Sequence, residues 1–315
     1  MLVAELNHTR RTGVELEAVV ADISGASRMA VQQRLAEIFS ANGLPSIARE
    51  YSHEPVPPGK VLCVEYDSSL VGHSDGWNGL SFHALEIKTK PLAGFDEFLA
   101  VVPKMVKLGA FLNLQVNKST GLHVHLDTAQ EVQNPRFIRS LLNLVYRFEP
   151  VIYGLVPPSR KSCGYCQPLP DFRQSWSRCH SELGYRRLLA GWSRYTGINL
   201  CHILSDNSRV EFRWAASSLD AEKITGWVAF LNRLVDAANT RNCQTPHEQV
   251  QNNRAGLHKM LVTLGLLQNT RVWTVSKDLA PIRRFLIRRW KQLNSDQLKR
   301  RSRHRNRIAA VIPPG

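Results

Sequence analysis

Long apolar segments are absent from this 315-residue sequence. No run approaches the roughly 20 apolar residues that a helix needs to span a bilayer. The opening residues, MLVAELNHTRRTG, lack the order of a signal peptide, in which basic residues precede an apolar stretch. Six cysteines are too few for a disulfide framework in a chain of this length. We therefore expect a cytoplasmic protein that has no membrane partner.

Acidic residues are also few, with 26 Asp and Glu against 41 Lys and Arg, which gives a net charge of +15. The excess is local, because residues 241–315 hold 16 basic and 3 acidic residues, and residues 1–240 are nearly neutral. The sequence therefore predicts a main domain at residues 1–240 and a basic helical extension at residues 241–315.

Two interpretations of this extension stay open. Residues 283–307, RRFLIRRWKQLNSDQLKRRSRHRNR, could contact the phosphates of a nucleic acid, or an acidic substrate or partner protein. They also fit a solvated amphipathic helix with Ile282, Leu286, Trp290 and Leu293 on its apolar face. Phosphate contacts weaken steeply with ionic strength, so the salt dependence of binding would separate the two.

Hydrophobic periodicity predicts an α+β domain. Helices are expected at residues 27–44, 95–113, 134–156 and 221–239, while residues 157–185 are typical of a loop. Strands are expected at residues 11–20, 60–70, 82–92, 120–127, 196–204 and 208–217, the last two as a hairpin that turns at SDNS. Short connections favour a mostly antiparallel sheet with helices on one side.

The strand TGLHVHLD, residues 120–127, carries two histidines two positions apart. Residues two apart on a strand point to the same face, so His123 and His125 should leave the sheet together. By itself, H-x-H is more typical of two polar residues on the solvent face of a half-buried strand.

Carboxylates at period-2 positions on other strands strengthen the case for a site. Glu15 and Glu17 share a face in GVELE, Glu86 interrupts HALEIK, and Glu211 stands two residues before Arg213 in VEFR. Carboxylates inside strands are costly unless they meet water or a cation. Carboxylates with an imidazole suit Mg²⁺ or Mn²⁺, and two such ions opposite an arginine can handle phosphate.

Six short motifs follow one another in roughly residues 10–240: G-x-E-x-E, D-x-S, E-I-x-x-x-P-L, G-L-H-V-H, R-Y-x-x-x-N-L and E-F-R. In this order they resemble the amidoligase family, within the glutamine synthetase and glutamate–cysteine ligase superfamily of carboxylate–amine ligases. The resemblance implies a curved, mostly antiparallel sheet that forms an open half-barrel active site, with helices on its outer face and a glutamine-synthetase-like catalytic core. It also implies that residues 1–240 are the catalytic domain.

The resemblance further implies a site that binds ATP with Mg²⁺ or Mn²⁺. Glu15, His123 and Glu211 match the group that holds the metal bridging the nucleotide phosphates. Glu17 and Glu86 match the group that holds the metal near the substrate carboxylate. Arg213, Arg194 and Asn199 match positions that contact the phosphates or the acyl-phosphate. Substrate contacts are expected from Asp67, Lys88 and His125. Asp67 could instead complete a metal site or accept the amine, and His125 is expected to hydrogen-bond to a metal ligand.

The implied reaction joins a carboxylate to an amine through an acyl-phosphate. The carboxylate could be a small molecule, a peptide or a protein side chain, and the amine donor is not readable from the sequence. One departure is EIKTKPL, because the family more often resembles E-I-V-S-P-P-L at this place. Lys88 and Lys90 thus replace uncharged residues and could change the carboxylate or amine pocket.

Three further features shape the expectations. The C-x2-C-x12-C-H pattern of Cys163, Cys166, Cys179 and His180 is compatible with a structural zinc, but it lacks a second C-x2-C, so zinc is not favoured. A metal-dependent phosphoesterase or nuclease would also use acids and histidines on strands, and it stays open as the alternative enzyme. A nucleic-acid-binding protein that acts through the basic segment is the third interpretation. No G-x-x-x-x-G-K phosphate loop and no convincing Ser/His/Asp elbow is found.

Overall fold

A computed structural model of the protein describes residues 2–22, 26–52, 54–67, 69–70, 81–171, 173–268 and 273–295. Its centre is an eight-stranded sheet in the order β3-β4-β5-β2-β7-β9-β8, with β6 paired to β2. The strands are β2 (Thr12–Asp22), β3 (Ser46–Ala48), β4 (Leu62–Glu65), β5 (Ser81–Thr89), β6 (Leu114–Gln115), β7 (Gly121–Asp127), β8 (Ile198–Asn199) and β9 (Arg209–Ala216). Among the described strand pairs of this sheet, β3–β4 is the parallel one and the others are antiparallel.

The sheet is open, with β3 and β8 as its edges in the described part of the chain. A mixed α/β fold with a mostly antiparallel sheet is therefore confirmed. The half-barrel shape and the glutamine-synthetase-like core stay predictions.

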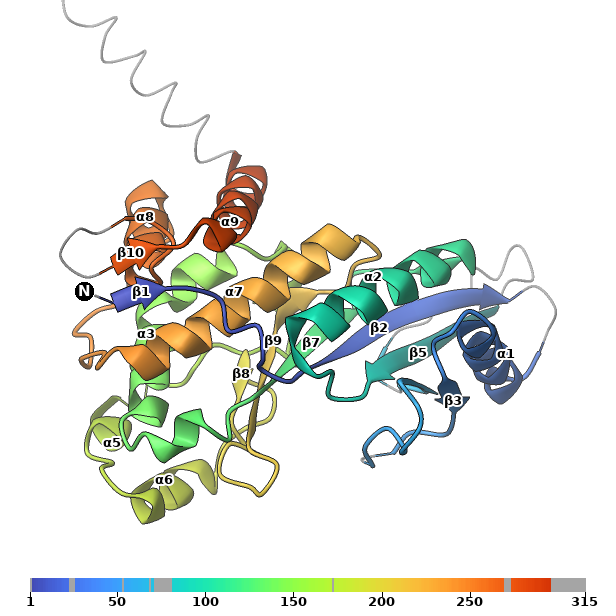
Figure 1. Ribbon diagram of the computed structural model, residues 1–315, viewed down its shortest axis with the longest axis horizontal. Helices are drawn as coiled ribbons and strands as arrows, with labels where there is room; N and C mark the ends of the chain where they lie inside the picture. The colour runs from blue at the N-terminus through green and yellow to red at the C-terminus, as the bar shows by residue number, and fades with distance from the viewer. Residues whose placement is uncertain are drawn as a thin grey trace, which may run out of the picture.

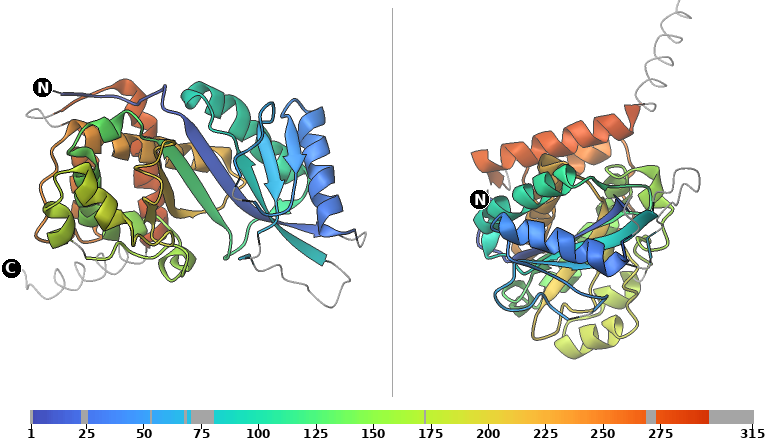
Figure 2. Two further views of the ribbon diagram at one scale, coloured as in Figure 1. Left: turned by 90° about the horizontal axis from the view of Figure 1, so that it is seen from below. Right: turned by 90° about the vertical axis from the view of Figure 1, so that its right-hand side faces the viewer.

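Three long helices cover one face of the sheet. They are α1 (Arg28–Ala41), which packs on β3 and β4, α2 (Gly94–Phe111), which packs on β2 and β6, and α7 (Ala221–Thr240), which packs on β7. Figure 1 shows α2 and α7 in front of the strands, and Figure 2 shows α1 along the β3–β4 edge. Helix α3 (Phe137–Tyr153) packs on α7 and adds a further layer. The three long helices α1, α2 and α7 thus lie on one side of the sheet.

The strands alternate between an apolar and a polar face. Every second residue of β2 and β7 is buried in the core: Val14, Leu16, Ala18, Val20, Leu122, Val124 and Leu126. Because side chains alternate along a strand, the intervening residues point to the face away from these helices. The charged and imidazole side chains of the central strands are gathered there.

Two expectations about local structure were wrong. Residues 157–185 hold three short helices, α4 (Pro158–Lys161), α5 (Arg173–Ser177) and the start of α6 (Glu182–Leu189), where a loop was expected. Such short helices give too little periodicity to detect; α6 begins because Ser181 accepts a hydrogen bond from the Gly184 N–H. The strand at 196–204 is only the two-residue β8, since the Asn199 side chain accepts a hydrogen bond from the Cys201 N–H at 3.0 Å and the following residues form turns.

The C-terminal region packs back onto the main domain. It contains α8 (Arg254–Thr263), β10 (Trp273–Val275) and α9 (Ala280–Leu293). Strand β10 pairs in parallel with β1 (Leu2–Ala4), next to the N-terminus, and α9 packs on α7 (Figure 1). Ile282, Leu286 and Trp290 are buried, as the amphipathic interpretation expects, and Leu293 is half-buried.

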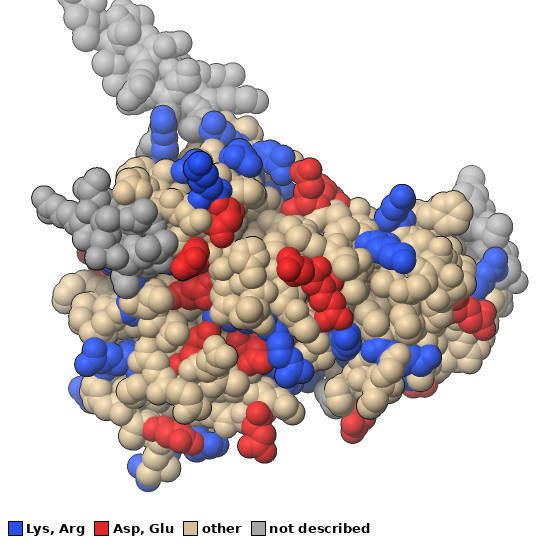
Figure 3. Space-filling view, in the orientation of Figure 1, with Lys and Arg blue, Asp and Glu red and all other residues tan. Residues whose placement is uncertain are grey.

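The outer side of α9 is basic. Arg284, Arg288 and Lys291 are exposed, and Figure 3 shows Lys and Arg side chains gathered over this helix. The last part of the basic segment, residues 296–315, lies outside the described residues. Among the described helices, none combines the length and the apolar character that a membrane span requires.

Candidate active site

The register of the sheet arranges the polar side chains in three rows across the strands. The first row is Glu65, Glu86 and Glu17; the second is Lys88, Glu15 and His123; the third is His125, Glu211 and Asn199. Residues directly opposite in antiparallel strands share a face and have Cβ atoms about 5 Å apart. Residues from positions 15 to 211 of the chain therefore meet on one surface.

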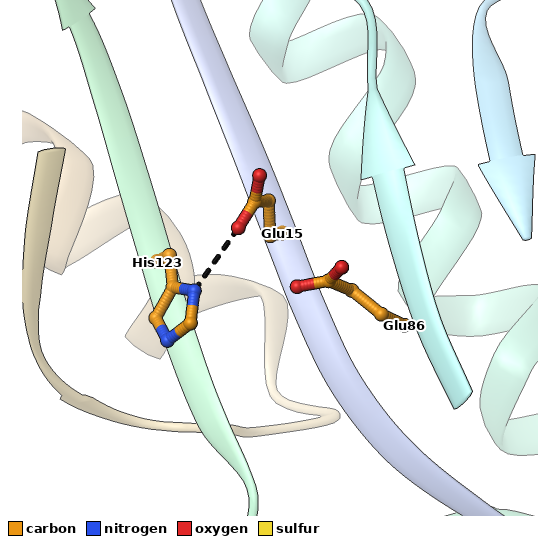
Figure 4. A group of neighbouring side chains, drawn as sticks. All are labelled: Glu15, Glu86 and His123. Carbon is orange, nitrogen blue, oxygen red and sulfur yellow. Dashed lines mark hydrogen bonds and ion pairs between the residues drawn. The ribbon is translucent and has the colours of Figure 1, made fainter. Parts of the chain in front are cut away.

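His123 lies between two carboxylates. Its Nδ1 is 3.0 Å from Glu15 Oε2, and its Nε2 is 3.2 Å from Glu17 Oε1. Figure 4 shows this imidazole on β7 pointing toward Glu15 of β2, while Glu86 of β5 approaches from the other side. The His123 ring is almost completely buried.

His125 has a different environment from His123. It stands opposite Glu211 in the ladder, and its Nε2 lies 3.2 Å from Glu15 Oε1. This nitrogen is buried, and Glu15 is its nearest charged partner. The register of β7 and β9 shifts between Leu122 and Val124, which is a β-bulge beside His123. The extra residue of this bulge is on β9. His123 stands opposite Glu15 in the β2–β7 register, and Glu211 is farther from it, at 3.7 Å.

The carboxylates near the histidines are stabilised in their ionised form. Burial alone would raise the pKa of Glu15, but the charge of His125 and the hydrogen bond with His123 hold this pKa well below its usual value. Burial likewise opposes ionisation of Glu211, yet His125, His123 and Arg213 lower its pKa. For His125, burial would lower the pKa, and the neighbouring Glu15 carboxylate raises it.

Glu86 has the opposite tendency. Burial raises its pKa well above the usual value, and the charges of Glu15 and Glu17 add to this effect, while Lys88 acts against it. The site therefore contains neighbouring carboxylates with divergent pKa values, a pattern common where acid–base chemistry or cation binding occurs.

Arg213 is anchored at the β9 end of the polar face. It pairs with Glu211 through Nη1, and its Nε donates to the Tyr165 carbonyl at 3.0 Å. Asn199 donates to the other oxygen of Glu211 at 2.6 Å. The exposed Arg194 instead donates to the Tyr195 hydroxyl at 3.1 Å, and it forms no ion pair with any carboxylate of the described part of the chain. Of the predicted site residues, all of which the structure describes, Arg194 alone is exposed.

Three overlapping groups of potential metal ligands occur among the described residues. They are Glu15, Glu86 and His123; Glu15, His125 and Glu211; and Glu17, Asp67 and Glu86, and in each group the ligand atoms lie within 4.8 Å of one another. Mixed carboxylate and imidazole ligands suit Mg²⁺ or Mn²⁺. The buried Nε2 of His125, 3.2 Å from Glu15 Oε1, belongs to the second of these groups. The residues present thus fit a divalent ion, and an imidazole of His123 or His125 takes part in two of the three groups.

Sequence patterns placed most of these residues but missed Glu65, Arg49 and Arg160. The Glu65 side chain is fully buried and accepts from Arg49 Nε at 2.6 Å. Its position two residues before Asp67 on a strand was a usable period-2 signal. Arg160 donates to the Arg213 carbonyl at 2.5 Å, and no sequence pattern in its segment could have indicated this.

Within the described residues, the cysteine-rich segment 163–180 does not form a group of metal ligands. Cys166 faces the Tyr153 hydroxyl, Cys179 contacts the Ser175 carbonyl, and His180 Nδ1 lies 2.9 Å from Arg139. The zinc pattern of Cys163, Cys166, Cys179 and His180 is not among the ligand groups of the described chain.

Comparison with known proteins gives one result. A family model described as "Putative amidoligase enzyme" matches residues 8–235, which include every strand of the central sheet and all the residues of the three rows. No curated protein matches the chain.

Proposed function

The chain belongs to the amidoligase family and is thus a ligase-type enzyme, and on this premise we propose that it joins a carboxylate to an amine in an ATP-dependent reaction. The carboxylate oxygen attacks the γ-phosphorus of ATP, which gives an acyl-phosphate and ADP. The amine nitrogen then attacks the acyl carbon, inorganic phosphate leaves, and the amine proton passes to a base. The products are an amide, ADP and phosphate.

One observation carries this proposal: carboxylates and imidazoles from four neighbouring strands form overlapping ligand groups with an anchored arginine at one end. A divalent ion bound there would neutralise negative charge on the phosphoryl group that is transferred. Glu15, His125 and Glu211 are the ligands proposed for the ion at the phosphates. Glu17, Asp67 and Glu86 form the group nearer the β4–β5 side of the site.

The chain's own residues supply three further functions. Arg213, fixed by Glu211 and by the Tyr165 carbonyl, presents a permanent positive charge beside the ligand groups. Asn199 fixes the orientation of the Glu211 carboxylate. Glu86 is a suitable acceptor for the amine proton, because burial raises its pKa and makes its carboxylate a stronger base.

The test is ADP release by the purified protein with ATP and Mg²⁺, in the presence of pooled carboxylates, amino acids and polyamines. Glu211→Gln removes a ligand charge at nearly constant volume and should abolish amine-stimulated ADP release. Glu97→Gln, which changes an acid at the start of α2 outside the site, is the matched control and should keep full activity. Mass spectrometry of the mixture would then identify the amide.

Other outcomes would change the assignment. Cleavage of phosphodiesters without ADP release would favour the metal-dependent phosphoesterase or nuclease. Equal amine-stimulated ADP release by wild type and Glu211→Gln would contradict the proposed ligand group.

The basic helix α9 is proposed to contact an acidic partner or a nucleic acid through its exposed side, which carries Arg284, Arg288 and Lys291. The positive charge of this exposed side supports the proposal. One of its residues, Arg288, also pairs with Glu222 of α7 at 3.4 Å. Binding to a single-stranded oligonucleotide that weakens steeply between low and high salt would support phosphate contacts. Salt-independent binding would count against them.

A further inference from the structure

Lys88 places a positive charge inside the acidic face. It stands two residues after Glu86 on β5, so both side chains leave the same side of the strand. Its Nζ lies 3.1 Å from Glu86 Oε2 and 2.9 Å from Glu65 Oε2. The Lys88 side chain is only 15% exposed. The ammonium therefore belongs to the interior of the site.

The contacts of this ammonium leave no donor for a substrate. A lysine has three N–H donors, and here the acceptors are Glu86, Glu65 and, at 3.5 Å, the Ser52 carbonyl. The Tyr51 ring lies 5.2 Å from Nζ and covers it further. Lys88 is thus positioned to act through its charge on the carboxylates, without contact to the reacting molecule.

Glu65 does not need Lys88 for its own neutralisation. Its Oε1 accepts from Arg49 Nε at 2.6 Å, and its Oε2 also accepts from the Ser52 N–H at 3.3 Å. Glu86 is different, because Lys88 is the only lysine or arginine with which it forms an ion pair in the described chain. The positive charge of Lys88 is therefore directed at the group formed by Glu17, Asp67 and Glu86.

We propose that Lys88 is a built-in cation that replaces the divalent ion at the Glu17–Asp67–Glu86 group, so that this protein works with one tightly bound ion at Glu15, His125 and Glu211. The inference rests on the proposed function, because it assumes that the acidic face binds divalent ions. One Glu86 oxygen is held by the ammonium, and a divalent ion at this group would be within a few ångströms of a like charge. At such distances the repulsion weakens ion binding by at least about tenfold, even with strong screening.

Lys90 offers a matched control on the same segment. It lies just after β5 and pairs with Glu97 at 2.8 Å, away from the three rows. Lys88→Met and Lys90→Met each remove one lysine charge and keep a long side chain. Only the first change should affect ion binding at the acidic face.

The experiment counts Mn²⁺ bound to the full-length chain by electron paramagnetic resonance of the free ion, without nucleotide. We expect one tight ion for wild type and for Lys90→Met, and two for Lys88→Met, with the second ion bound at least about tenfold more tightly than in wild type. Glu211→Gln should remove the single tight ion of the wild type, which assigns that ion to the His125 group. Circular dichroism checks that each variant is folded.

Each other outcome has a defined consequence. Two tight ions in wild type would overturn the proposed role of Lys88 and leave the ligase assignment intact, and this count needs no variant. One ion in wild type and one in folded Lys88→Met would also overturn it. No Mn²⁺ bound by any of the proteins would overturn both the role of Lys88 and the metal-dependent function.

Discussion

Replacing Glu149 with glutamine should change how stability depends on pH. Glu149 lies on α3 and is 2% exposed, and its carboxylate accepts a hydrogen bond from the Leu169 N–H at 2.8 Å. Burial raises the pKa of this carboxyl group from 4.5 to about 7, against the opposing effect of that hydrogen bond. Glutamine can accept the same hydrogen bond and cannot ionise.

The sign and size of the effect of Glu149 on the unfolding free energy follow from its pKa values in the folded and the unfolded state. Below about pH 4.5 the group is protonated in both the folded and the unfolded state, so it imposes no penalty on folding. As the pH rises to 7, the unfolded chain releases the proton more readily, and the folded state loses stability relative to it. The pKa difference corresponds to about 3 kcal/mol at pH 8, at about 1.4 kcal/mol per unit.

Urea unfolding of wild type and Glu149→Gln at pH 4.5, 6 and 8 would measure this effect. The unfolding free energy of the variant minus that of wild type should be about 3 kcal/mol more positive at pH 8 than at pH 4.5. Using the difference removes the contribution of the other carboxylates, which titrate in both proteins. A difference that is the same at all three pH values would refute the reasoning.

Glu97→Gln is a control of opposite sign. The Ala93 N–H and Lys90 lower the pKa of Glu97. The ionised Glu97 carboxylate therefore stabilises the folded state above the normal pKa of a glutamate, and this stabilisation is lost as the pH falls below it. Glu97→Gln should cost more stability at pH 8 than at about pH 3, because the loss occurs below the unfolded pKa of 4.5; this trend is the reverse of that at Glu149.

Three further changes test the fold and the site. Gly94→Ala should cost more than about 2 kcal/mol of stability in urea unfolding, because Gly94 has φ +89° and the new Cβ would clash with the His8 carbonyl oxygen. Gly59→Ala is the control: Gly59 has φ +77° but open space around it, so the change should cost only about 1 kcal/mol. Equal costs for the two variants would contradict the clash. Trp290→Ala should lower the unfolding free energy by about 3–5 kcal/mol if the basic extension is part of the core, and a change below about 1 kcal/mol would show that it is not. His125→Asn should weaken Mn²⁺ binding at least about tenfold, measured by calorimetry, whereas unchanged affinity would remove His125 from the ligands.

Period-2 patterns predicted the polar face of the sheet because both the signal and the structure are local to each strand. Glu15 and Glu17 had to share a side of β2, as did His123 and His125 of β7. The long helices α1, α2, α3 and α7 were also readable from their apolar spacing and from Asn42-Gly43 at the end of α1.

The remaining features depend on register between strands, which a single strand does not encode. The bulge beside His123 decides that His125 faces Glu211, and the β4–β5 register brings Glu65 to Lys88. Strands β1 and β10 have three residues each and are about 270 positions apart, too short and too distant to pair by pattern. Lys88 and Lys90 were equivalent in the sequence, yet one enters the site and the other pairs with α2.

The core and the candidate site are specified by the same register. A slip of β2 by one residue against its neighbours would turn Val14 and Leu16 to the polar face and drive Glu15 and Glu17 under the helices. Each carboxylate buried without a partner costs several kcal/mol. The acidic residues therefore oppose every slip by an odd number of residues, in addition to any catalytic role. Carboxylates at period-2 positions thereby fix which face of each strand meets the helices, and the ligand groups depend on this choice.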